Sequence, residues 1–244
     1  MKNLRNLFLI LISLSVAACV KDTPGPGSSG VRVSVRQQAL FTASGNVLYA
    51  YTKDGLAQYD ATNATGLTAV KTTTVTGIIP TTLTSGSNYI YTAGAGNFNI
   101  YNTTTGTPTL SATYSDYQGC APVAVNGNYA FITERLDSYC GSIYTQLKVV
   151  DISNPAKPVL IKAYPLSSPA GIAVDGNNLF ICDKGLKYYD ASNPANLVLK
   201  LTLPIASTTL AAQNGKLAAA GPDGLYQFDY STGALVQISK LKLN

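Results

Sequence analysis

The side chains that could support acid–base chemistry are few, because this 244-residue chain has one glutamate, Glu134, and no histidine. The lack of histidine excludes a Ser-His-Asp triad and the usual histidine-containing catalytic zinc sites. Glu134 with Asp137 or Asp116 is then the one conceivable carboxyl pair for glycoside hydrolysis. The chain lacks the arginine cluster of sialidase-type sites and has no tryptophan. We therefore expect no enzymatic activity and no cofactor. A surface glycoside hydrolase that uses Glu134 with a nearby aspartate is the alternative.

Most of the aspartates fall at repeated turn positions, where a structural role is expected. One set follows strand-like runs: Asp60, Asp151, Asp190 and Asp229. A second set, Asp54, Asp183 and Asp223, precedes Gly or Lys-Gly. A ring of three such carboxylates could hold Ca²⁺, which needs six to eight oxygen ligands. Too few oxygens are identifiable here, so we predict no metal site.

Tyrosines and charged residues gather around one long insertion and suit recognition better than catalysis. Tyrosine and arginine are enriched at binding hot spots, because they combine a large contact area with polar tips. The predicted ligand-binding residues are Tyr114, Tyr117, Glu134, Arg135, Asp137, Tyr139 and Tyr144. A loop insertion with no function is the alternative for this segment.

The elements that must position these residues come from a repeat that occurs five times. The clearest copies begin LKVVDISNPAKPVL at Leu147 and LKYYDASNPANLVL at Leu186. A turn glycine recurs in steps of 41, 41, 49 and 39 residues, at Gly45, Gly86, Gly127, Gly176 and Gly215. A fixed period of this length indicates a repeat architecture.

Each copy contains four strand-like runs, which in the fourth copy are GIAVDG, NLFICD, LKYYDA and LVLKLTLP. Four antiparallel strands every forty residues or so are typical of a propeller blade. We predict an all-β, five-bladed propeller over residues 31–244, with blades at about 37–77, 78–118, 119–165, 166–204 and 205–244. Residues 31–36 form one extra strand, expected to pair with the last copy and close the ring. The alternatives are a six-bladed ring completed by a partner and an open β-solenoid.

Strand parity predicts that the insertion and the connection before it meet on one face. In an up-and-down blade, the loop after the second strand and the connection into the first strand emerge together. Cys120 lies in that connection and Cys140 in that loop, so we predict a disulfide between them. On the chain-entropy model, such a bridge stabilises by roughly 3 kcal/mol. Cys182 lies in an apolar run and is expected to be a buried free thiol.

The run LKVVDISNPAKPVLIKAYPL (147–166) resembles the repeat of the LVIVD family of bacterial propeller lipoproteins of Bacteroidetes type. The likeness is close there and fair at residues 186–204. It decays elsewhere, because Asn102 replaces the aspartate and the proline is missing from the first and fifth copies. The resemblance implies the propeller fold over the whole body and no particular activity.

The N-terminus reads as a lipoprotein signal peptide over residues 1–18. Lys2 and Arg5 precede an apolar run too short to span a bilayer, which needs about twenty residues. The run ends in VAAC at Cys19, which resembles the bacterial lipobox, whose cysteine is lipidated on its thiol and acylated on the new amine. Residues 20–30, rich in Gly, Pro and Ser, read as a flexible tether.

The sequence therefore predicts a lipid-anchored protein of the cell envelope, in the outer membrane of a Gram-negative bacterium. Its propeller is expected to act as a binding or protein-interaction module for an envelope protein or a glycan. Nucleic acid is not an expected partner, because the formal net charge of +5 is scattered without a basic run.

Overall fold

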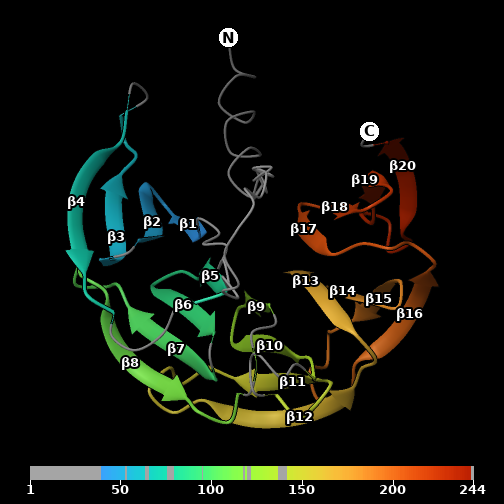
Figure 1. Ribbon diagram of the computed structural model, residues 1–244, viewed down its shortest axis with the longest axis horizontal. Coiled ribbons are helices and arrows are strands. Elements are labelled where there is room, and N and C mark those ends of the chain that lie inside the picture. Colours follow the sequence, from blue (N-terminus) through green and yellow to red (C-terminus); the bar gives the residue numbers. More distant parts are fainter. Residues whose placement is uncertain are drawn as a thin grey trace, which may run out of the picture.

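The computed structural model describes residues 40–52, 54–63, 66–75, 80–94, 96–117, 119, 122–136 and 142–242. Within these ranges, twenty strands form five antiparallel sheets, each with its four strands in chain order. The sheets follow one another around an axis (Figure 1). The first strand of each sheet contacts the first strand of the next, and the fourth strand forms the outer rim. The prediction of a five-bladed, all-β propeller with four-stranded blades is confirmed. No helix in the described ranges is long and apolar enough to cross a membrane.

The strand bounds follow the repeat. Blade 1 holds β1 (Leu40–Ser44), β2 (Val47–Thr52), β3 (Gly55–Asp60) and β4 (Thr68–Thr73). Blade 2 holds β5 (Thr82–Ser85), β6 (Tyr89–Gly94), β7 (Asn97–Asn102) and β8 (Thr109–Tyr114). Blade 3 holds β9 (Val123–Asn126), β10 (Tyr129–Glu134), β11 (Gln146–Asp151) and β12 (Val159–Pro165). Blade 4 holds β13 (Pro169–Asp175), β14 (Asn178–Asp183), β15 (Leu186–Asp190) and β16 (Val198–Leu203). Blade 5 holds β17 (Thr209–Gln213), β18 (Lys216–Gly221), β19 (Gly224–Asp229) and β20 (Val236–Leu241).

The turn between the third and fourth strands is held by the residue that ends the third strand. In all five blades, a side-chain oxygen of this residue accepts a hydrogen bond from the backbone amide two residues later, over 2.7–2.8 Å. The residues are Asp60, Asn102, Asp151, Asp190 and Asp229. Asn102 keeps the bond because its amide oxygen accepts as a carboxylate does. The structural role predicted for the four aspartates of this set is confirmed.

Successive blades are joined by hydrophobic clusters between facing sheets. The third residue of the second strand supplies a large ring to four of these clusters, namely Tyr49, Tyr91, Phe131 and Phe180. Phe180 of blade 4, for example, lies 4.9 Å from the ring of Tyr230 in blade 5, centroid to centroid. Aromatic pairs at this separation add about 0.5–1.5 kcal/mol beyond the area they bury.

The ring is open between blade 5 and blade 1 as far as the described residues show. The four clusters join blades 1–2, 2–3, 3–4 and 4–5, and none joins blade 5 to blade 1. Blades 5 and 1 stand apart in Figure 1. Blade 5 has Ala218 at the position where the other blades have an aromatic ring. The predicted closure of the ring depends on an extra strand at residues 31–36, which lies outside the described residues, so the closure stays a prediction.

Cys182 is a buried free thiol, as predicted. Its Sγ lies 3.0 Å from Oγ of Ser207 in blade 5. Burial raises the pKa of the thiol above its ordinary value. This cysteine therefore fills space as a small apolar residue.

Candidate functional site

The stem of the blade 3 insertion is fixed by bonds between its two arms. Strand β10 ends at Glu134 opposite Gln146, where β11 begins. Nε2 of Gln146 donates to Oε2 of Glu134 over 2.6 Å. One residue further out, the backbone amide of Leu136 donates to Oγ1 of Thr145 over 3.1 Å. The insertion therefore leaves the sheet as a narrow, braced loop.

A buried ion pair lies beneath this stem. The side chains of Glu134 and Lys148 are 0% and 5% exposed, and Oε1 of Glu134 lies 3.2 Å from Nζ of Lys148. The same ammonium lies 3.2 Å from Oδ2 of Asp116 and donates to its backbone carbonyl. Because Asp116 belongs to the connection from β8 to β9, Lys148 ties that connection to the insertion. A buried carboxylate needs such a counter-charge to remain ionised at low cost.

Two tyrosines of the connection complete the base of the insertion. The hydroxyl of Tyr114 donates to Oδ2 of Asp116 over 3.1 Å, and Tyr117 is fully buried in the cluster that joins blades 2 and 3. Burial, and then the nearby Asp116 carboxylate, raise the pKa of Tyr114. Burial, and then the charge of Glu134, raise the pKa of Tyr117. Both phenols therefore stay neutral, and Tyr117 and Glu134 support the insertion from below instead of forming its contact surface.

Three large apolar or aromatic side chains are exposed among the described residues of the insertion. Leu136 is 66% exposed, Ile143 is 67% exposed and Tyr144 is 49% exposed, with Arg135 exposed beside them. Large apolar side chains that gather at the surface mark interaction sites more often than isolated ones do. Sequence reasoning named Arg135 and Tyr144 but missed Leu136 and Ile143, because single aliphatic residues near a loop carry no distinct signal.

The rest of the predicted site lies outside the described residues: Asp137, Tyr139, Cys120 and Cys140. The neighbours of the two cysteines do approach each other. A Cβ placed on Gly119 would lie 3.4 Å from Cβ of Ser142, so these two chain segments touch. The disulfide stays a prediction, and this contact agrees with the strand parity on which it rests.

The geometry gives no support to a glycoside hydrolase that uses Glu134. A glycosidase needs both carboxyl groups at the scissile bond, whereas Glu134 is fully buried and its two oxygens are engaged by Lys148 and Gln146.

The second set of aspartates is likewise engaged by protein groups. Asp183 accepts two backbone amides from the connection before β13 and pairs with Lys187 at 2.6 Å. Burial alone would raise the pKa of Asp183, but these bonds outweigh it and lower the pKa. Asp223 pairs with Lys240 at 3.2 Å. Within the described ranges, no three Asp, Glu, Cys or His side chains form a group that could hold a metal ion.

The two buried ion pairs occupy the same place in successive copies of the repeat. Lys148 and Lys187 each follow the leucine that opens the third strand region, and Glu134 and Asp183 each end the second strand. The sequence signal was present in the shared Leu-Lys of LKVVD and LKYYD, read together with an acid before the loop.

The fold and its inter-blade packing define a five-bladed β-propeller. The chain carries LVIVD repeats, since the family described as "LVIVD repeat" matches residues 120–165 and 169–203. The resemblance seen in the sequence is thus confirmed for blades 3 and 4. No curated protein matches the chain in sequence.

Two solved structures share this architecture. A functionally unknown protein from Desulfotomaculum acetoxidans DSM 771 is 13% identical with a TM-score of 0.65, covering 86% of this chain and 72% of its own. A chain from the mitotic checkpoint complex is 16% identical with a TM-score of 0.61, covering 93% and 74%. At these identities the likeness shows the fold alone.

Proposed function

We propose that this protein is a lipid-anchored, non-catalytic binding module of the bacterial cell envelope, and that the blade 3 insertion contacts its partner. The observation that carries the proposal is the exposed set Leu136, Ile143 and Tyr144, next to Arg135, on a loop braced from below. Exposed apolar groups on a preorganised support lose little conformational entropy on binding. An apolar set of this kind favours an envelope protein over a glycan as the partner.

The anchor is proposed at Cys19, after removal of residues 1–18, and places the propeller at the outer membrane. The basis is the apolar run that ends in VAAC and the Gly-, Pro- and Ser-rich residues that follow. Two or more acyl chains on one residue make a stable anchor, whereas one is marginal. Metabolic labelling with an alkyne fatty acid should mark the parent protein and leave Cys19→Ser unmarked.

The binding surface is tested by capture from envelope extract with purified protein as bait. We expect one or more proteins to be retained by the parent and lost from the double variant Leu136→Asp/Ile143→Asp. The matched control is Leu110→Asp/Val198→Asp, which changes two residues that are also more than half exposed, on the outer strands β8 and β16. Equal capture by the parent and by the insertion variant would remove the insertion as the contact surface.

A further inference from the structure

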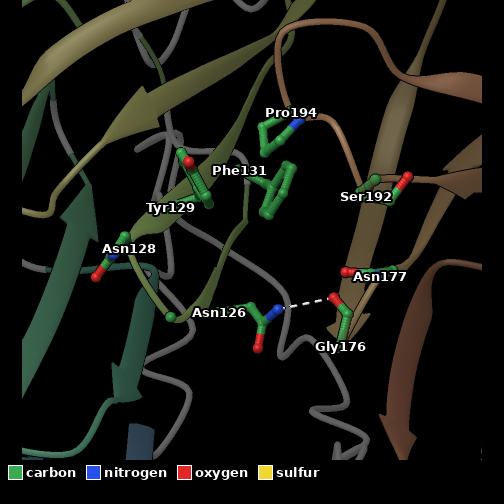
Figure 2. Close-up of a pocket in the computed structure, with 10 residues that line it drawn as sticks. Asn126, Asn128, Tyr129, Phe131, Gly176, Asn177, Ser192 and Pro194 are labelled. Atoms are coloured by element: carbon green, nitrogen blue, oxygen red, sulfur yellow. Dashed lines mark hydrogen bonds between the residues drawn. The ribbon is translucent and has the colours of Figure 1, made fainter.

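A hollow of about 210 Å³ lies between blades 3 and 4, on the face opposite the insertion. Blade 3 contributes Asn126, Asn128, Tyr129 and Phe131 from one side, and blade 4 contributes the facing turns (Figure 2). Nδ2 of Asn126 donates to the carbonyl of Gly176 over 2.7 Å, an exposed bond that joins the two blades beside the hollow. The hollow therefore lies between the turns that join β9 to β10 and β13 to β14, and the Asn126–Gly176 bond holds these turns together.

The hollow exists because one side chain is small. In every blade, the backbone amide of the residue after the third strand donates to the carbonyl of the last residue of the first turn, over 2.8–2.9 Å. This residue is Ile152 in blade 3 and Tyr230 in blade 5, and both are buried against the preceding blade. In blade 4 it is Ala191, which lines the hollow. Between blades 3 and 4 this position therefore holds only a methyl group, whereas a larger side chain fills it between blades 2 and 3 and between blades 4 and 5.

The lining is polar but carries no charge. Amides come from Asn126, Asn128 and Asn177, and hydroxyls from Ser192 and Tyr129. A charged ligand would meet no counter-charge here, and a purely apolar side chain would remove water from the amides without replacing their hydrogen bonds. A ligand that matches both features is a ring with an apolar face and hydroxyl groups around its edge.

The size agrees with one such ring. A hollow of 210 Å³ holds several water molecules, and one sugar ring can take their place. It is below the roughly 300 Å³ at which drug-sized ligands begin to fit. Tyr129 and Phe131 both line the hollow and supply aromatic surface for the apolar face of the sugar (Figure 2). We propose that the hollow between blades 3 and 4 binds one neutral pyranose unit of a glycan.

The test is ligand-observed saturation-transfer NMR on the purified protein. The probes are the methyl glycosides of glucose, galactose, mannose and N-acetylglucosamine, with methyl glucuronide as the charged comparison. At least one neutral glycoside should show transfer, and Ala191→Ile should raise its Kd at least about ten-fold by filling the hollow. The matched control is Ala61→Ile, the same change at the equivalent, exposed position of blade 1, which should leave Kd unchanged.

Two further variants keep the test decisive. If Ala191→Ile unfolds, Tyr129→Val, which installs the residue that blade 1 has at Val47, should weaken binding by a similar factor. Leu136→Asp/Ile143→Asp should bind the glycoside as the parent does, so this site and the proposed partner surface fail independently. Transfer to none of the neutral glycosides, preference for the glucuronide, or equal binding by the parent and the filled variant would each overturn the proposal.

Discussion

Replacing Lys148 by methionine should expose how much the buried ion pair contributes to stability. The ion pair between Lys148 and Asp116 contributes little to this effect, because the Asp116 side chain is 62% exposed. Exposed ion pairs contribute at most about 1 kcal/mol to stability. Glu134 is fully buried, and at 3.2 Å with an effective dielectric constant of 20 its attraction to Lys148 is about 5 kcal/mol. Breaking a buried pair from one side typically costs about 3–5 kcal/mol. Because Gln146 still donates to the Glu134 carboxylate, we expect Lys148→Met to lower the free energy of unfolding by about 3 kcal/mol. This corresponds to a fall in Tm of about 6–12 °C.

The assay is urea unfolding at pH 7, followed by circular dichroism and tyrosine fluorescence. The double variant Glu134→Gln/Lys148→Met should regain most of the loss, because it removes both charges at once. Lys71→Met, on the exposed strand β4, is the control and should change the free energy of unfolding by less than about 0.5 kcal/mol. A cost below about 1 kcal/mol for Lys148→Met, or a double variant no more stable than the single one, would refute this reasoning.

Three further predictions concern other parts of the fold. Gly221→Ala should lower the free energy of unfolding by more than about 2 kcal/mol, measured in urea, since its Cβ would lie 1.8 Å from the carbonyl oxygen of Ala206. The pKa of Asp183 is lower in the folded state than in the unfolded chain, where it is about 3.9. The Asp183 carboxylate therefore stabilises the fold at pH values above about 3.9, and this stabilisation is lost as the pH falls through the lowered pKa. The difference in stability between the parent and Asp183→Asn should therefore shrink between about pH 5 and pH 2, and a constant difference would contradict it. Cys120 and Cys140 should resist alkylation until a reductant is added. Reduction of the predicted disulfide should lower the free energy of unfolding by roughly 3 kcal/mol. Alkylation of Cys120 without reductant would exclude the bridge.

The fold was predictable because the repeat carries its own local chemistry. Asp60, Asp151, Asp190 and Asp229 each hold the turn that their residue type favours, and Asn102 does so where the aspartate is replaced. Turn residues at a fixed spacing specify the blade before any long-range contact is known.

The sequence predicted that certain side chains lie near one another but not how deeply they are buried. Strand parity brings Tyr114 and Glu134 to the same end of blades 2 and 3, and the structure joins them through Asp116 and Lys148. A charged residue beside a loop is usually exposed, so the sequence alone suggested that Glu134 lies at the surface. Its burial depends on Lys148, which reaches it from the neighbouring strand. The sequence shows the shared Leu-Lys and the acid before the loop, but the depth of the pair is set by the packing of the folded sheet.

The order of the blade interfaces has a consequence for how the molecule comes apart. Within the described residues, four hydrophobic clusters join the blades in series, so a middle blade is held on two sides and blades 1 and 5 on one side each. Opening should therefore begin at the two ends of the array and move inward. Amide hydrogens of β1–β4 and β17–β20 should exchange with deuterium before those of blade 3. Blade 3 can open only after it separates from the blades on both of its sides.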